Sequence, residues 1–279
     1  GGREALIGNN PVGLGLPGPK GAHVMLDMAL SVAARSRVRA AAEMGAEIPD
    51  SWATDATGRP TTDARAAMEG LMQAIGGAKG KTFVIGGDGR YFNAEAIQTI
   101  LRMAAANGAH RAIVGQNGLL STPAASNLIR QRETDGGLIL SASHNPGGID
   151  EDFGLKFNTA NGGPAPEKVT AAMYEETKRI SEYHTLDAQD IDLGSIGETR
   201  LGEMTVEIVD PVEDYTALMK TLFDFDAIRA HIAGGFSLKF DAMHAVTGPY
   251  AKAILEGALG APAGTVLNGE PKVQIAPHG

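Results

Sequence analysis

The 279-residue sequence contains no cysteine. Disulfides, cysteine-ligated zinc and a thiol nucleophile are therefore excluded, and the absence fits a reducing compartment. The longest apolar runs fall well short of the roughly 20 residues that a membrane-spanning helix needs. The first residues, GGRE, lack the apolar segment of a signal peptide. We therefore expect a cytoplasmic protein without a membrane partner.

Aromatic residues make up only 5% of the chain. Basic residues are fewer than acidic ones, which gives a formal net charge of −9. This acidity argues against general binding to nucleic acid or to anionic membranes. It does not exclude phosphate ligands, because clustered backbone N–H groups bind anions even in an acidic protein. The 37 glycines and few aromatics favour many tight turns between strands and helices over an all-β sandwich.

From residue 82 onward, short apolar runs alternate with segments of helical periodicity. This alternation predicts an α/β fold with largely parallel strands. The expected strands are 82–85, 111–115, 137–141, 205–209 and 238–241, and the expected helices cover 97–105, 122–132, 166–181, 212–223 and 249–259. The polar stretch 184–203 reads as an interdomain connection, and residues 205–209 as the start of a second unit.

Before residue 82 the pattern is less regular. Residues 5–21 are rich in glycine and proline and are predicted to be mostly loop. Helices are expected over 31–44 and 64–75, and Gly76 and Gly77 should end the second one.

In the regular region after residue 82, the helix expected at 122–132 should begin with Thr122 as its N-cap.

One turn carries a candidate nucleophile. Residues 137–148, GLILSASHNPGG, bring an apolar strand to a glycine-rich turn that presents Ser143 and His144. A hydroxyl among free N–H groups can hold a phosphate as an ester, and His144 and Lys156 can supply positive charge or move protons. Such groups suit phosphoryl transfer, although a lone Ser-His-Asn turn is more often an ordinary loop.

The length of a family match favours the chemical interpretation of this turn. Residues 137–166 resemble the active-site serine loop of the α-D-phosphohexomutases, the family of the phosphoglucomutases. Further segments resemble the family in its own order: 86–93, 104–124, 205–215 and 240–250. The resemblance runs from residue 81 to about 268.

The resemblance implies a mixed sheet flanked by helices and a specific reaction. Glucose 1-phosphate and glucose 6-phosphate would interconvert through a phosphoserine at Ser143 and a glucose 1,6-bisphosphate intermediate. By position, His144 matches the family's loop histidine, and Lys156 matches a lysine that assists proton transfer. Mg²⁺ would bind to the phosphate on Ser143.

Several family features are absent from this sequence. The metal loop Asp-Gly-Asp-Gly-Asp-Arg is missing, and its nearest text, residues 86–90, has one acid. Because a hard divalent cation needs several oxygen ligands, Ser143 alone cannot hold Mg²⁺. The sugar-recognition loop and the C-terminal phosphate-binding domain are also missing, and the opening segment with its active-site arginine is replaced. We therefore expect the chain to lack full mutase turnover.

Residues 5–80 resemble a different family, the malate/L-lactate dehydrogenases of the ureidoglycolate type. The matching segments are 7–17, 26–63 and 74–80. The resemblance makes four residues candidates for binding NAD(P): Asp27, Met28, Ala29 and Lys79. It leaves two alternatives to a mutase open, an NAD(P)-dependent oxidoreductase and a non-catalytic composite reading frame.

These resemblances predict three parts. Residues 1–80 would be a dehydrogenase-like fragment, and residues 81–203 a phosphohexomutase first domain that has lost its opening strand and helix. Residues 204–279 would be an incomplete second α/β domain. The loss would expose an apolar sheet face or edge unless residues 1–80 cover it. We therefore expect marginal stability, self-association or both, with a sugar phosphate as the ligand.

Overall fold

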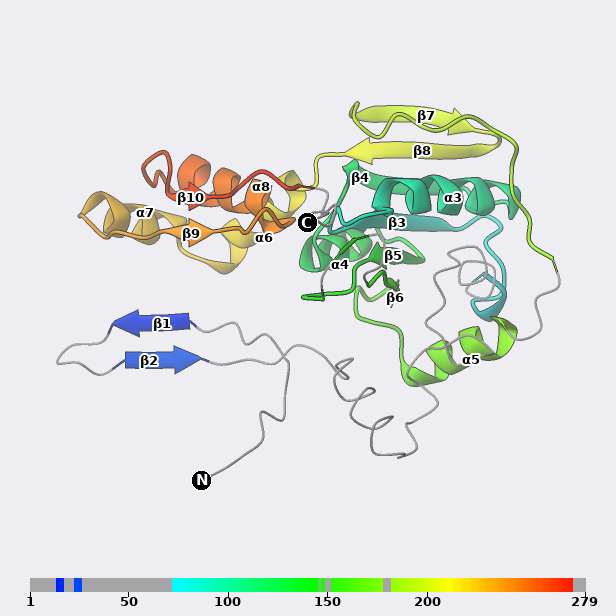
Figure 1. Cartoon of the computed structure of the whole chain (residues 1–279), viewed down its shortest axis with the longest axis horizontal. Helices are drawn as coiled ribbons and strands as arrows, with labels where there is room; N and C mark the ends of the chain where they lie inside the picture. Colours follow the sequence, from blue (N-terminus) through cyan, green and yellow to red (C-terminus); the bar gives the residue numbers. More distant parts are fainter. Residues whose placement is uncertain are drawn as a thin grey trace, which may run out of the picture. The chain divides into compact units, whose positions relative to one another are not determined.

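The computed structural model describes the backbone of residues 14–17 and 23–26, and the chain over 72–145, 147–148, 152–177 and 182–272. Residues 1–60 and 61–279 form two compact units. In the first unit, strands β1 (Leu14–Pro17) and β2 (His23–Leu26) pair antiparallel (Figure 1). The expectation of loop is therefore wrong at Leu14–Pro17. Proline is tolerated there because a two-stranded ribbon consists of edge strands. The helix expected at 31–44 lies outside the described residues.

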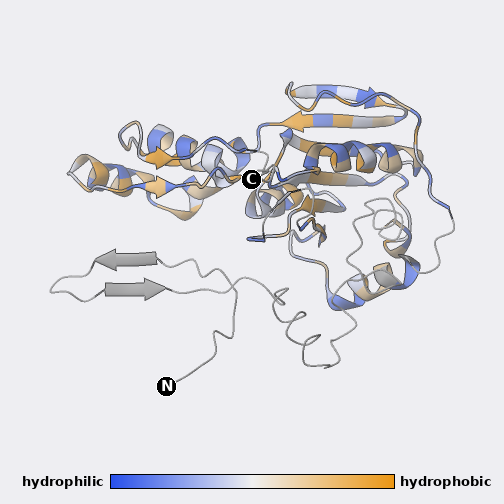
Figure 2. Cartoon of the chain, viewed as in Figure 1, coloured by the Kyte–Doolittle hydropathy of each residue, from blue (hydrophilic) through white to orange (hydrophobic). Residues whose placement is uncertain are grey.

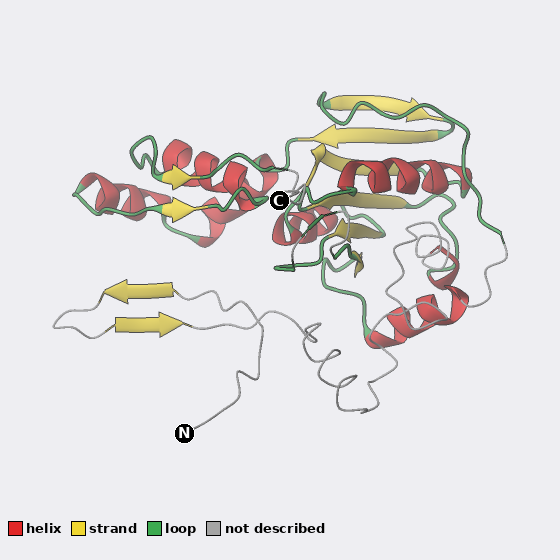
Figure 3. Ribbon diagram, in the orientation of Figure 1, coloured by secondary structure: helices red, strands yellow, loops and turns green. Residues whose placement is uncertain are grey.

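The second unit is built on a six-stranded sheet with the order β6-β5-β3-β4-β8-β7. The inner four strands pair in parallel, and the two outer strands pair antiparallel. The expected mixed sheet flanked by helices is thereby confirmed (Figure 3). The strands are β3 (Thr82–Gly87), β4 (Arg111–Leu119), β5 (Gly136–Leu140), β6 (Leu155–Thr159), β7 (Gly197–Leu201) and β8 (Met204–Val209).

Helices cover both faces of this sheet. Phe83 and Ile85 of β3 join one buried cluster with helix α3 (Asn93–Ala106), whereas Val84 joins another with helix α4 (Thr122–Gln131). Successive side chains of a strand point to opposite faces, so α3 and α4 lie on opposite sides. The continuous apolar runs of the central strands follow from burial on both faces (Figure 2).

The start of α4 differs by one residue from the expectation. Ser121 is the N-cap, and its hydroxyl accepts a hydrogen bond from the Ala124 N–H. Thr122 is the first helical residue. A third helix, α5 (Glu167–Thr177), begins one residue after its expected start, and residues 178–181 of the expected range lie outside the described residues.

Residues just before β3 contribute to the core on the α3 side. Residues 72–74 are helical, and the expected stop is present, because Gly76 and Gly77 adopt positive φ and the Gly77 N–H donates to the Met72 carbonyl. Met72 and Ala78 are each 1% exposed and belong to the buried cluster under α3. Residues 72–80 therefore cover part of the sheet face, which is one of the two outcomes that the sequence left open.

The expected interdomain connection at 184–203 is wrong for residues 197–201, which form the edge strand β7. Four of the five β7 residues are exposed, so the strand carries no apolar signal. The strand at 205–209 joins this same sheet as β8, parallel to β4, instead of opening a second unit. The local sequence does not specify which sheet a strand joins.

A second, smaller α/β element follows β8. Strands β9 (Phe240–Asp241) and β10 (Val266–Leu267) pair in parallel. The helices are α6 (Glu213–Leu222), α7 (Phe225–Ala233), α8 (Thr247–Ala251) and the π-helix η2 (Lys252–Ala258). This element contacts the main sheet's helix layer through Tyr250, whose hydroxyl accepts from the Ser121 N–H at 3.1 Å. In the described part of the chain, no helix is long and apolar enough to cross a membrane.

Candidate active site

Ser143 lies in the turn that leaves the carboxyl end of β5, and it is exposed. Its φ of 58° is left-handed, a conformation that costs a non-glycine residue on the order of 1 kcal/mol. The Ser143 N–H donates to the Ser141 hydroxyl at 3.0 Å, and the Ser141 N–H donates to the Gly154 carbonyl at 2.8 Å. One of these hydrogen bonds lies within the turn, and the other ties the turn to the segment before β6.

Strand β6 brings Lys156 to this turn. It runs antiparallel to β5 with Lys156 opposite Ile139, and the Lys156 ammonium donates to the Ser143 hydroxyl at 2.9 Å. Although the residue as a whole is exposed, its ammonium lies against the turn. Desolvation there lowers the pKa of Lys156, with a raising effect from Asp88 and a lowering one from Arg90. Two of the three predicted residues are therefore in direct contact.

His144 follows Ser143 in the same turn and is exposed. Its proposed proton transfer stays a prediction.

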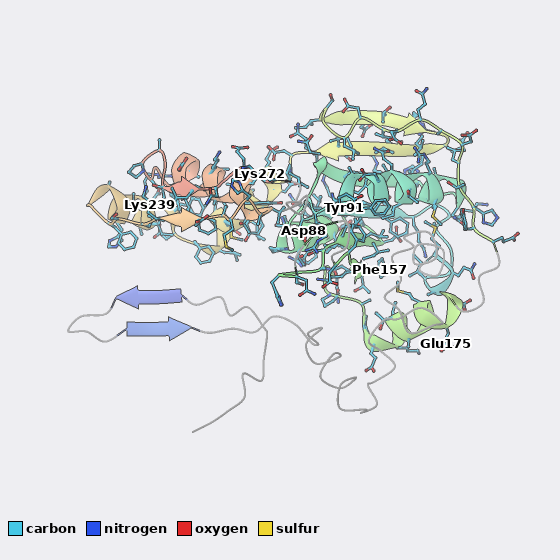
Figure 4. The ribbon with its side chains drawn as sticks, in the orientation of Figure 1. Asp88, Tyr91, Phe157, Glu175, Lys239 and Lys272 are labelled. Carbon is cyan, nitrogen blue, oxygen red and sulfur yellow. The ribbon has the colours of Figure 1, made fainter. Side chains whose placement is uncertain are left out.

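The structure adds Arg90, which sequence reasoning missed. Its side chain is 6% exposed and forms a bidentate ion pair with Asp88, with distances of 2.8 to 3.1 Å. It also donates to the carbonyls of Ser143 at 3.2 Å, Asn145 at 3.4 Å and Asp152 at 2.6 Å. Figure 4 labels Asp88, which comes from the loop after β3.

The sheet explains why these loops meet. Strands β3 and β5 are parallel neighbours, and Gly87 pairs with Leu140 at their carboxyl ends. Loops that leave the same edge of a parallel sheet lie side by side, and ligands bind at such edges. The sequence does place Arg90 in the GGDGR segment directly after a buried strand, and this position could have indicated a role at the site. From the sequence, this segment is part of the family resemblance and is too poor in acids for a metal loop, and neither observation gives Arg90 a role.

The residues at this site do not fit a Mg²⁺ ion held by protein ligands alone. Among the described residues, no group of three or more histidine, aspartate or glutamate side chains could hold a metal ion. The nearby carboxylate of Asp88 is paired with Arg90. The phosphate on Ser143 would thus have no adjacent acidic cluster to complete the coordination.

The NAD(P) site expected from the sequence stays a prediction. Asp27, Met28 and Ala29 lie outside the described residues. Lys79 is exposed in the turn before β3, close to Gly108.

Comparison with known proteins covers the part of the chain that contains Ser143. Residues 59–184 match the model of the phosphoglucomutase/phosphomannomutase α/β/α domain I. A phosphoglucomutase of Rhizobium radiobacter is 56% identical over 211 residues, which are 76% of this chain and 39% of that protein. This portion of the chain is therefore similar to phosphohexomutases in sequence.

Other phosphohexomutases support the assignment. The phosphoglucomutase of Schizosaccharomyces pombe is 52% identical over 196 residues, covering 70% of this chain and 35% of its own length. The open form of pp63/parafusin, a phosphoglucomutase from Paramecium, superposes with a TM-score of 0.71 at 42% identity, covering 75% of this chain and 40% of that one. A putative phosphomannomutase of Thermus thermophilus, at 21% identity and a TM-score of 0.58, supports the fold alone. The chain spans well under half the length of these phosphohexomutases.

The other expected resemblance is also present. Residues 1–86 match the malate/L-lactate dehydrogenase model. The two family matches overlap over residues 59–86, so one chain matches both family models, as the two resemblances predict. The position of the junction near residues 80–82 stays a prediction.

Proposed function

We propose that this chain is a phosphoglucomutase-like phosphoryl carrier in which Ser143 is the residue that is phosphorylated. The supporting observation is the 2.9 Å hydrogen bond from the Lys156 ammonium to the hydroxyl of Ser143, an exposed residue whose φ is positive. The similarity to phosphoglucomutases supplies the substrate class, a hexose phosphate. The proposed reaction interconverts glucose 1-phosphate and glucose 6-phosphate through glucose 1,6-bisphosphate.

In the loading step, the Ser143 oxygen attacks one phosphorus of the bisphosphate, and the bond from that phosphorus to the sugar oxygen breaks. The hydroxyl proton passes to the neutral amine of Lys156 and from there to the departing sugar oxygen. Phosphoserine returns the group to a sugar monophosphate by the reverse path. A lowered pKa of Lys156 favours this role, because more of the amine is then neutral near physiological pH.

The described residues do not supply the carboxylate ligands that a Mg²⁺ ion requires. Mg²⁺ on the phosphoserine oxygen would offset the charge of the transferring group, but the described residues offer it no cluster of acidic ligands. We therefore propose that Ser143 accepts phosphate while full mutase turnover is impaired. Robust conversion of glucose 1-phosphate by the isolated chain in a coupled assay would contradict the impairment.

Intact-mass measurement tests the carrier role. After exposure to glucose 1,6-bisphosphate, the wild-type chain should gain the mass of one phosphoryl group, and Ser143→Ala should gain none. Ser237→Ala removes another exposed serine and should load like wild type. A wild-type chain that gains no mass, or an adduct that persists in Ser143→Ala, rules the carrier role out.

The pH dependence of loading tests Lys156. The loading rate should rise with pH as the amine loses its proton, with a midpoint below the ordinary lysine pKa, because desolvation favours the neutral form. Lys156→Met should load slowly and without this rise. An identical pH profile in the variant would exclude Lys156 as the proton acceptor.

A second candidate function follows from the match of residues 1–86 to a malate/L-lactate dehydrogenase. This function is NAD(P)-dependent oxidation, with Asp27, Met28, Ala29 and Lys79 on the cofactor side. Titration with NADH and NADPH would reveal binding as a change in nicotinamide fluorescence, and an unchanged signal would count heavily against the function.

A further inference from the structure

We propose that Arg90 is a positioning residue that holds the Ser143 turn and the segment leading to Lys156 in their working arrangement. The inference rests on the proposed role of Ser143 as the phosphate carrier. Arg90 donates to the carbonyl of Ser143 and to two other backbone carbonyls, so it would act through the backbone.

The contacts of Arg90 converge from two parts of the site. Two of its carbonyl partners, those of Ser143 and Asn145, belong to the serine turn. The third, that of Asp152, lies in the segment that enters β6, the strand that carries Lys156. One guanidinium therefore connects the turn that bears the hydroxyl with the segment that bears the amine.

Asp88 fixes the guanidinium itself. The carboxylate contacts both the Nε and Nη2 atoms, and the Asp88 N–H donates to the Leu140 carbonyl at the end of β5. The orientation of Arg90 is therefore set by the strand ends. A planar guanidinium can meet one carboxylate and several carbonyls at once, whereas a lysine ammonium has three donors and no fixed plane.

This arrangement accounts for the backbone of Ser143. With its carbonyl directed to Arg90 and its N–H directed to the Ser141 hydroxyl, the peptide groups on both sides of Ser143 are fixed. The left-handed φ follows from that constraint, and it points the hydroxyl toward Lys156. Without Arg90, nothing in this set of contacts would direct the Ser143 carbonyl inward, and the turn could relax to an ordinary backbone conformation.

The experiment compares three variants of the full chain. Arg90→Met removes all the hydrogen bonds of the guanidinium. Arg90→Lys keeps the positive charge but lacks the planar group that binds Asp88 and the carbonyls together. Arg111→Met is the matched control: it removes another arginine that binds two carboxylates, those of Glu198 and Glu207, at the opposite end of the same sheet. Each is measured for hydrogen exchange of the Ser143 and Asn145 amides, for the rate of phosphate loading from glucose 1,6-bisphosphate, and for its unfolding midpoint.

In Arg90→Met we expect both amides to exchange roughly tenfold to a hundredfold faster and loading to slow by a similar factor, as for the loss of hydrogen bonds to a charged group. Arg90→Lys should recover part of both effects at an unchanged unfolding midpoint. That separates positioning from a general loss of stability. The Arg111→Met control should leave the turn and the loading rate as in wild type.

The inference is overturned if the turn amides and the loading rate of folded Arg90→Met match those of wild type, or if Arg111→Met alters them equally. If Arg90→Met does not fold, the same readouts on Arg90→Lys and Asp88→Asn decide the question. A wild-type chain that fails to load would remove the carrier function, and amide exchange would still report whether Arg90 orders the turn.

Discussion

The main sheet and the C-terminal element, residues 213–272, are stabilised differently. In the sheet, central residues such as Val84, Ile85 and Leu138 are fully buried, and helices cover both faces. In the C-terminal element, α6 and η2 have no buried residue, and a core cluster contains only Ala242, Ala251 and Val266. The comparison indicates that the sheet provides its own stability, whereas the C-terminal element depends more on its contact at Tyr250.

Exposed apolar surface follows the same division. Of the exposed large hydrophobic residues among those described, most lie in the C-terminal element: Leu222, Phe223, Phe236, Met243 and Leu267. A hollow of about 360 Å³ there is lined mostly by apolar side chains, which come from α7, from η2 and from Phe236, Leu238 and Leu259. This surface agrees with the expectation of self-association, which stays a prediction to be checked by sedimentation.

The largest expected difference between the two regions concerns core truncation. Leu138→Ala should lower the free energy of unfolding by about 2 to 5 kcal/mol, because it leaves a cavity between fully buried neighbours. Leu255→Ala on the half-buried η2 should cost about 1 kcal/mol or less. Urea denaturation of both variants measures the contrast, and equal losses would refute the proposed division.

The next test adds volume instead of removing it. A Cβ at Gly87 would lie 2.4 Å from the Leu140 carbonyl oxygen and 2.1 Å from Asn93 Oδ1. Gly87→Ala should therefore destabilise the sheet by about 1 to 3 kcal/mol. At Gly257 the nearest atom would be 3.7 Å away, so Gly257→Ala should be neutral or stabilise by up to about 1 kcal/mol. Thermal melts of the pair should shift in opposite directions.

The smallest expected effect concerns the contact between the regions. Tyr250→Phe leaves the buried Ser121 N–H without its hydroxyl acceptor, which should cost about 1 kcal/mol. Limited proteolysis should then cut the C-terminal element faster while the sheet resists. Equal protection of both regions in the variant would show that Tyr250 does not hold the element in place.

The same tyrosine should make stability depend on alkaline pH. Burial raises the pKa of Tyr250, partly offset by its hydrogen bond with Ser121. Because the folded pKa exceeds the unfolded value of about 10, this stabilisation is complete below pH 10 and is lost as pH rises toward the folded pKa. Wild type should therefore lose more stability above pH 10 than Tyr250→Phe does.

Much of the central fold could be predicted because the buried strands are continuous apolar runs bounded on one side by glycine. The strands at Thr82, Arg111 and Gly136 are such cases. β7 was missed because its exposed residues Glu198 and Arg200 give it the composition of a connection. The pairing of β8 with β4 was missed because it depends on tertiary contacts between distant segments.

The residues of the candidate site could be predicted where they lie in one continuous segment. They could not be predicted where the site depends on contacts between segments that are distant in the sequence. Ser143 and Lys156 could be proposed from one continuous segment that resembles a known loop. Arg90 donates hydrogen bonds to backbone carbonyls more than fifty residues away in the sequence. Because every residue has a backbone carbonyl, the sequence does not indicate which carbonyls accept such bonds. Only the neighbouring carboxyl ends of β3 and β5 reveal that contact.

The pairing of β8 with β4 also bears on how the chain folds. Strands β3, β4 and β5 follow one another with single helices between them, whereas roughly ninety residues separate Arg111 from its partner Thr205. Closing so long a loop is entropically slow. The hairpin of β7 and β8 should therefore dock last, onto a preformed three-stranded nucleus. Pulse-labelled hydrogen exchange during refolding would record late protection of Val206 and Ile208 relative to Val84 and Ile85.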